Sequence, residues 1–470
     1  MDEIVIRGGR PLAGTVRVGG AKNAALPILF ASLLTEEPCI VDNLPGVVDC
    51  RTAGRLLAGL GVDVETSPGR AILRAADVRR FEAPYDLVKT MRASFLALGP
   101  LLARFGEAKV ATPGGCAIGS RPVDLHLLGL EQMGAEIAHS HGYVTARAPE
   151  GGLRGARIAL PFPSVGATEN LMLAAALSRG TTVIENAARE PEIVDLAVVL
   201  EGMGAVVRGA GTSVVEVEGR ERLGGFRHVV IPDRIEAGTF LLAVAATGGD
   251  ALVEGARADH LEALVVKLRE AGVEIEPCET GLRVRREGEL RAVDVTTAPH
   301  PGFPTDLQAQ FMALMCFARG NSKITETIFE NRFMHVQELA RMGADIRVEG
   351  ASATVHGGVP LEGAPVMATD LRASVCLVVA ALAAQNTTRL QRVYHLDRGY
   401  EEIEVKLSRL GASIERVAGA GPVPAVAAAA AHGGRSRLGT RRPSDPQSEP
   451  IAAERATEGR RARRRVQGRE

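Results

Sequence analysis

The segment LEQMGAEI at residues 130–137 contains the pattern that decides the fold of this chain. A helix-like run ends at Met133, Gly134 follows, and an alternating, strand-like stretch begins. Glycine suits the left-handed position that closes a helix, because a residue with a Cβ is strained there. The pattern recurs at intervals of about 70 residues, with its glycines at Gly61, Gly134, Gly204, Gly272, Gly343 and Gly411. One structural unit is therefore predicted to occur six times.

Each unit also contains an alanine-rich helix that is apolar on nearly all sides, followed by a strand rich in β-branched residues. A helix that is apolar on all sides is buried on all sides, so three such helices should form the centre of each half, with short mixed sheets around them. The predicted fold class is therefore α/β, with two domains of three βαβαβ-type units each. The six buried helices are expected to begin near Lys22, Met91, Gly166, Glu236, Asp306 and Leu371.

We expect the first domain to cover residues 20–230 and the second to combine residues 1–19 with 231–418, because the opening strands should pair within the second half. Residues 419–470 form an Ala/Arg-rich tail with almost no large apolar side chains, which predicts disorder. Arginine-rich arms can contact nucleic acid, but charged runs are more often a solvated appendage. No nucleic-acid partner is therefore expected, and the sequence leaves the oligomeric state open.

Composition narrows the class of protein further. The apolar runs are shorter than the ~20 residues that a membrane crossing needs, and the acidic start is unlike a signal peptide, so we expect a cytoplasmic protein with no membrane contact. Six cysteines lie scattered without a C-x-x-C pair, which argues against zinc and against a disulfide framework.

The candidate binding residues lie in the loops that enter the helices. Because the units are alike, equivalent loops should lie on the same face of their domain. Helix N-termini carry unpaired N–H groups and about half a positive charge, so several of them aimed at one cleft make a site for a phosphate or carboxylate. Helix capping or surface pairing would explain any one of these residues alone. The set comprises Lys22, Asn23, Arg92, Arg121, Asp124, Ser164, Val165, Gly166, Asp306, Arg332, Asp370, Arg372 and Arg398.

A loop at residues 113–124, rich in glycine and proline, contains the candidate catalytic residue Cys116. A thiol near cations such as Arg121 has a lowered pKa and can act as a proton donor, base or nucleophile. By contrast, Cys316 and Cys376 lie on apolar helices and are expected to be small buried hydrophobes. The segment GGAKN at 19–23 lacks the Walker A spacing, so nucleotide hydrolysis has no support.

Several of these stretches resemble the UDP-N-acetylglucosamine 1-carboxyvinyltransferases of the enolpyruvyl transferase family. They are GAKNA at 20–24, KTMRAS at 89–94, the loop 113–124, residues 186–195, residues 298–306, FENRFMH at 329–335, ATDLRAS at 368–374 and YHLDRGYE at 394–401. The resemblance extends to about residue 417. It implies a two-domain inside-out α/β barrel like that of EPSP synthase, with no metal and no cofactor.

In that family the enolpyruvyl group of phosphoenolpyruvate is transferred to the 3-hydroxyl of UDP-N-acetylglucosamine and phosphate is released, which is the first committed step of peptidoglycan synthesis. By resemblance, Cys116 donates the proton to C3 and is the thiol that fosfomycin alkylates, and Asp306 is the base. Lys22, Arg121 and Arg398 would hold phosphoenolpyruvate, with Asn23 beside them. The nucleotide-sugar site would comprise Arg92, Arg121, Pro122, Val123, Asp124, Leu125, Ser164, Val165, Gly166, Asp306 and Ile328.

Three other interpretations remain. The sister enzyme that makes 5-enolpyruvylshikimate 3-phosphate shares the fold and the donor but lacks the cysteine loop. An RNA 3′-phosphate cyclase has a related repeat but needs a nucleophilic histidine, for which no motif is present. A non-catalytic paralogue that binds a nucleotide sugar is disfavoured by the presence of Lys22, Cys116, Asp306 and Arg398.

Overall fold

The computed structural model describes residues 2–112 and 123–418. Within these ranges the strands form six four-stranded sheets, and each sheet combines one parallel pair with two antiparallel pairs. The prediction of short mixed sheets is therefore confirmed. In the first half, the sheets have the strand orders β14(Phe226–Val229)-β3(Cys39–Asp42)-β5(Arg70–Arg74)-β4(Asp63–Ser67), β6(Glu82–Ala83)-β7(Glu107–Ala111)-β9(Tyr143–Arg147)-β8(Glu136–Ser140) and β10(Arg157–Ala159)-β11(Thr181–Glu185)-β13(Val214–Glu218)-β12(Val206–Arg208).

The second half repeats this arrangement and includes both opening strands. Strand β1(Glu3–Arg7) pairs with β23(Thr387–Gln391), and β2(Ala13–Arg17) pairs with β15(Asp250–Glu254). The strand orders are β22(Pro365–Met367)-β23-β1-β24(Ser413–Val417), β16(Glu274–Cys278)-β17(Gly281–Arg285)-β15-β2 and β18(Val295–Thr296)-β19(Asn321–Thr325)-β21(Ser352–His356)-β20(Asp345–Glu349).

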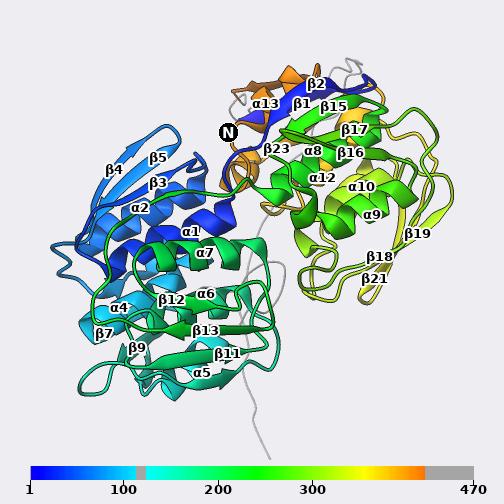
Figure 1. Cartoon of the computed structure of the whole chain (residues 1–470). Coiled ribbons are helices and arrows are strands. Elements are labelled where there is room, and N and C mark those ends of the chain that lie inside the picture. The colour runs from blue at the N-terminus through cyan, green and yellow to red at the C-terminus, as the bar shows by residue number, and fades with distance from the viewer. Residues whose placement is uncertain (1, 113–122, 419–470) are drawn as a thin grey trace, which may run out of the picture. The chain divides into compact units, whose positions relative to one another are not determined.

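The apolar helices lie at the centre of each half, as their composition predicts. In the second half α8(Arg234–Thr247), α10(Gln308–Met315) and α12(Val375–Ala383) pack against one another (Figure 1). In the first half α6(Val165–Ala175) contacts both α1(Lys22–Ala31) and α4(Leu98–Phe105). The second helix of each unit is α2(Val48–Leu60), α5(Asp124–Gln132), α7(Pro191–Gly202), α9(Glu262–Glu270), α11(Val336–Arg341) or α13(Ile403–Arg409). The remaining short helices are η1(Ser32–Leu34), α3(Tyr85–Val88), η2(Arg92–Ala97), η3(Ala258–His260), η4(Thr305–Leu307) and η5(Val393–Arg398).

Two separate hydrophobic cores lie inside one compact unit formed by residues 2–112 and 123–418. One core includes buried residues from Ala21 to Val230, and the other combines residues between Ile4 and Val18 with those between Ile235 and Leu410. The domain boundaries at 19/20 and 230/231 stay a prediction, and the tail 419–470 lies outside the described residues.

The glycines that close the repeats adopt the backbone conformation that the sequence predicts. All six have positive φ, from 87° at Gly411 to 109° at Gly61. Because a side chain would strain the chain at these angles, glycine is the residue that allows each helix to turn directly into a strand. The α/β fold class with its repeated units is confirmed.

Two predicted helix starts are wrong. The second buried helix, α4, begins at Leu98 instead of near Met91, because residues 92–97 form the 3-10 helix η2. The last buried helix begins at Val375 instead of near Leu371. The carboxylate of Asp370 accepts hydrogen bonds from the backbone N–H groups of Arg372 and Ala373, at 2.7 Å each, and Ser374 Oγ accepts from Thr369 and Asp370. These bonds hold residues 371–374 in a turn before the helix.

Candidate active site

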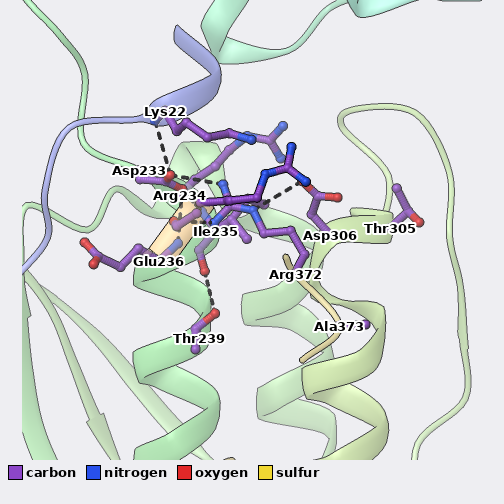
Figure 2. A network of polar contacts seen from close by, with 12 residues as sticks. Lys22, Asp233, Arg234, Ile235, Glu236, Thr239, Thr305, Asp306, Arg372 and Ala373 are labelled. Carbon is purple, nitrogen blue, oxygen red and sulfur yellow. Dashed lines mark hydrogen bonds and ion pairs between the residues drawn. The ribbon is translucent and has the colours of Figure 1, made fainter. Parts of the chain in front are cut away.

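The candidate site is built around Asp233, which caps the N-terminus of α8. Its Oδ1 accepts hydrogen bonds from the backbone N–H groups of Ile235 at 2.8 Å and Glu236 at 3.1 Å. Its Oδ2 accepts from the guanidinium of Arg372 at 3.2 Å and from the backbone N–H of Lys22 at 3.4 Å (Figure 2). An aspartate is favoured at this position by capping and by the positive end of the helix. Asp233 thereby joins the start of α1 to the start of α8 and to the turn before α12.

Arg372 is a buried cation that is held on several sides. Besides the bond to Asp233, it donates to the carbonyl of Gly399 at 3.1 Å, and its guanidinium lies over the ring of Tyr400, 5.1 Å from the ring centroid. Its Nε also lies 3.7 Å from Oδ2 of Asp306. Burial by itself would lower the pKa of Arg372, but Asp233, Tyr400 and Asp306 outweigh it and raise the pKa above its usual range. The charge is therefore permanent and fixed in place.

Asp306, the predicted base, lies between two arginines. Oδ1 accepts from Arg332 at 2.8 Å, and Arg332 also donates to Thr305 Oγ1 at 3.1 Å. Burial would raise the pKa of Asp306, but Arg332 and Arg372 outweigh it and hold the pKa well below its usual range. The carboxylate is therefore ionised at neutral pH, as a base must be, yet it is a weak base while both arginines contact it.

Lys22 and Arg398, both predicted to hold the donor substrate, share one carboxylate that sequence reasoning missed. Asp49, at the start of α2, accepts from Lys22 Nζ at 3.3 Å and from Arg398 Nε at 3.0 Å. Asp49 is only 3% exposed and Lys22 only 7%. A nearby bond from the Gly46 N–H to Glu401, at 3.0 Å, joins the same two segments of chain. The carboxylate of Asp49 therefore holds two cations side by side, an arrangement suited to a small ligand with more than one negative charge.

The residues predicted to bind the nucleotide sugar lie mostly at other helix starts of the first half. The Ser164 side chain caps α6 by accepting from the Ala167 N–H at 3.4 Å, and Val165 and Gly166 form the first turn of the helix. Asn23 lies in the first turn of α1, and Arg92 begins η2. Val123, Asp124 and Leu125 stand at the start of α5. Cys116, Arg121 and Pro122 lie outside the described residues.

Two residues that were predicted to contact the ligand, Ile328 and Asp370, form hydrogen bonds with nearby residues of the chain. The backbone N–H of Ile328 donates to Glu326 at 2.8 Å, and Asp370 holds the turn before α12.

Within residues 2–112 and 123–418, no group of histidine, cysteine and acidic side chains is arranged to bind a metal ion. Of the helices that the structure describes, none has the length and apolarity to cross a membrane.

Comparisons with known proteins agree with this architecture. The model of the EPSP synthase (3-phosphoshikimate 1-carboxyvinyltransferase) family matches residues 6–407. A UDP-N-acetylglucosamine 1-carboxyvinyltransferase of Sorangium cellulosum is 59% identical over 421 residues, covering 89% of this chain and 99% of that protein. One from Xanthobacter autotrophicus is 58% identical over 430 residues, covering 89% of this chain and all of that protein.

Solved structures show the same fold. The enolpyruvyl transferase NikO from Streptomyces tendae superposes with a TM-score of 0.78 at 26% identity, covering 88% of this chain and 98% of that one. EPSP synthase from Acinetobacter baumannii superposes with a TM-score of 0.70 at 17% identity, covering 89% of this chain and 100% of that one, which bears on the fold alone. The chain is thus a transferase of the EPSP synthase family and belongs, within it, to the UDP-N-acetylglucosamine 1-carboxyvinyltransferases.

Proposed function

We propose that this enzyme transfers the enolpyruvyl group of phosphoenolpyruvate to the 3-hydroxyl of UDP-N-acetylglucosamine and releases phosphate, as the first committed step of peptidoglycan synthesis in the cytoplasm. The observation that carries the proposal is the 59% identity to a relative of that name over nearly its whole length. The paired cations Lys22 and Arg398 support it, because phosphoenolpyruvate carries both a phosphate and a carboxylate.

The reaction assigns a task to each group. C3 of phosphoenolpyruvate gains a proton from Cys116, C2 becomes electrophilic, and the sugar oxygen attacks it while its proton leaves towards Asp306. Phosphate then departs from the tetrahedral intermediate, and C3 returns a proton to Cys116 as the enol ether forms. Lys22, Arg121 and Arg398 stabilise the charge that develops on the donor.

Asp306 accepts the hydroxyl proton only as its contacts with the arginines weaken. In the described structure Arg332 and Arg372 lower its basicity. A ligand anion that competes for either guanidinium would raise the pKa of Asp306 towards the range of a useful base. Arg332 and Arg372 are accordingly proposed as substrate-binding residues that also control this base, and Asp370 as a substrate-binding residue.

The test is an assay of phosphate release from phosphoenolpyruvate with either UDP-N-acetylglucosamine or shikimate 3-phosphate as acceptor. We expect activity with the nucleotide sugar alone, and activity with shikimate 3-phosphate alone would assign the sister function. Cys116→Ala should abolish release, while Cys116→Asp should retain part of it, because a carboxylic acid can also donate a proton. Fosfomycin should add its mass to the wild-type protein and leave Cys116→Ala unmodified in intact mass spectrometry.

A further inference from the structure

One buried histidine that the mechanism does not use lies beside the start of α6. His126, in α5, is 7% exposed, and its ring makes an edge-to-face contact with Phe95 at 5.2 Å between ring centroids. Its Nδ1 lies 3.0 Å from the side-chain amide of Asn170, a fully buried residue of α6. The two side chains thus connect α5, α6 and η2 at the end where the helices begin.

The hydrogen bonds of Asn170 determine which nitrogen of His126 carries the proton. The backbone N–H of Gly99 can only donate, and it lies 2.8 Å from Oδ1 of Asn170, so that atom must be the amide oxygen. The amide NH₂ therefore faces the carbonyl of Phe95 at 3.4 Å and Nδ1 of His126. Because the NH₂ group can only donate, Nδ1 must accept. A neutral His126 then has its hydrogen on Nε2.

This Nε2–H group lies against the first turn of α6. A Cβ built on Gly166 would stand 3.4 Å from Nε2 and 3.3 Å from Cε1, so the ring edge lies directly over the glycine. Gly166 belongs to the turn whose N–H groups have no partner within the helix. Within the described residues, no hydrogen bond to Nε2 of His126 is found. A donor on a largely buried side chain therefore adjoins a helix N-terminus that already favours anions.

We propose that His126 is a substrate-binding residue whose Nε2–H, together with the N–H groups of the first turn of α6, holds a phosphoryl oxygen of the nucleotide sugar. The inference rests on the proposed function and adds a residue to its acceptor site. A neutral donor strengthens the anion site without the cost of burying a further charge. Glycine at 166 allows the imidazole to approach the backbone closely enough to share a ligand with it.

The environment keeps this donor neutral. Burial, followed by the charge of Arg92, lowers the pKa of His126 to about 3. Protonation would place an N–H on Nδ1 opposite the amide NH₂ of Asn170, which also disfavours the cation. The hydrogen bond to the ligand should consequently be independent of pH across the neutral range.

The first test reads the tautomer directly. In full-length protein with ¹⁵N-labelled histidine, the nitrogen shifts of His126 at pH 7 should report a protonated Nε2 and an unprotonated Nδ1, and the His126→Gln spectrum assigns the signal. A proton on Nδ1 would overturn the proposal. This readout does not depend on turnover, so it is separable from failure of the proposed reaction.

The second test uses steady-state kinetics of folded variants. His126→Phe keeps the ring contact and removes the donor, so the KM for UDP-N-acetylglucosamine should rise about tenfold. The KM for phosphoenolpyruvate should stay within about twofold, and His126→Gln should restore part of the loss, because its amide can donate. If the wild-type enzyme is active and His126→Phe leaves the KM for the nucleotide sugar unchanged, the role of His126 is overturned and the proposed function is not. Absence of wild-type turnover with this acceptor would overturn the proposed function instead.

The third test replaces the amide of Asn170, which donates to Nδ1 of His126, with a carboxylate, which can only accept. Asn170→Asp keeps the bond from Gly99 but obliges Nδ1 to donate, so a neutral ring loses its Nε2–H and only a protonated ring retains it. The affinity for UDP-N-acetylglucosamine, measured by calorimetry from pH 8 to 6, should therefore rise as the pH falls in this variant alone. Asn321→Asp, beside the exposed His356 on β19 and β21, provides the matched control. A pH-independent affinity in folded Asn170→Asp would contradict the proposal.

Discussion

His126 and His335 occupy the same place in the repeat, before Gly134 and Gly343, yet their surroundings differ. Both are buried, and burial lowers the pKa of each to about 3. Nδ1 of His126 is bonded to Asn170, whereas Nδ1 of His335 is buried with no partner among the described residues. Nε2 of His335 contacts Met312 Sδ at 3.3 Å, whereas that of His126 lies over the start of α6. The repeat thus determines where a side chain lies but not what it does.

The same contrast holds for the helix starts of the two halves. In the second half, Asp306 pairs with Arg332 and with Arg372. Arg372 also pairs with Asp233, and Figure 2 shows Asp233, Asp306 and Arg372 close together. In the first half, the starts of α5 and α6 rely on neutral hydrogen bonds and on the helix ends themselves. We infer that Asp306, Arg332 and Arg372, together with Lys22 and Asp49 of the first half, supply fixed charges for the chemistry. The starts of α5 and α6 supply neutral donors that recognise the acceptor substrate.

The largest expected effect on stability comes from removing Arg372 from its buried ion pairs with Asp233 and Asp306. Arg372→Met should lower the free energy of unfolding by ~3–5 kcal/mol, because the buried carboxylate of Asp233 loses the arginine that pairs with it and Asp306 keeps only Arg332. Urea unfolding followed by circular dichroism measures the change. The control is Arg283→Met, which removes an exposed arginine paired with Asp250 and should leave the midpoint nearly unchanged. Equal shifts in the two variants would show that the buried ion pairs contribute no more to stability than an exposed one.

The variant Asp49→Asn tests whether the carboxylate of Asp49 positions Lys22 and Arg398 for binding phosphoenolpyruvate. Asp49→Asn keeps the shape but no longer balances Lys22 and Arg398, so kcat/KM for phosphoenolpyruvate should fall about tenfold or more. The KM for the nucleotide sugar should change little in the same assay. Asp42 also pairs with two arginines, Arg70 and Arg227, but at the surface, so Asp42→Asn is the matched control. An Asp49→Asn enzyme as active as this control would exclude the positioning role.

The sequence predicted the parts of the fold that local chemistry determines. Glycine at a helix end has one favoured use, so all six closing glycines were found, and the apolar composition of the central helices revealed their burial. In the structure Asp306 contacts Arg332 and Arg372, and Asp233 accepts from both Lys22 and Arg372, while the roles of these residues in a site stay a prediction. The start of α12 was missed because the side chains of Asp370 and Ser374 compete for the backbone there.

The missed site residues have long-range partners. Asp49 meets Arg398, and His126 meets Asn170, only after the chain has folded, and neither pair has a fixed spacing that a sequence could reveal. Asp233 did leave a signal, because Asp233 and Glu236 have the spacing of a capping box. In the structure, Glu236 turns away to bind the Gly19 N–H at 2.7 Å and Lys406 at 2.7 Å.

The two buried histidines should destabilise the fold in acid. Each has a folded-state pKa of about 3, below its usual value near 6.5, so the unfolded chain binds protons first and stability is lost as the pH falls from 6.5 towards 3. Between pH 6.5 and 5 the loss is ~2 kcal/mol for each histidine. Unfolding of wild type, His126→Gln and His335→Gln across this range should show a shallower pH dependence in both variants. Curves parallel to wild type would mean that these rings already protonate in the folded state.

Gly166→Ala should have the smallest effect on activity of these variants, and it tests whether His126 and the start of α6 contact the same group of the substrate. The added Cβ would stand 3.3 Å from Cε1 of His126, a contact tight enough to displace the ring by a few tenths of an ångström without unfolding the helix. The KM for UDP-N-acetylglucosamine should therefore rise a few-fold, with the KM for phosphoenolpyruvate unchanged. Gly59→Ala in α2, where a Cβ meets nothing within 4 Å, controls for the general effect of alanine in a helix, which stabilises by ~0.5–1 kcal/mol. If Gly166→Ala raises the KM and His126→Phe,Gly166→Ala raises it no further than His126→Phe alone, the two residues act on the same ligand group. Additive effects would instead mean that the glycine and the histidine contact the substrate independently.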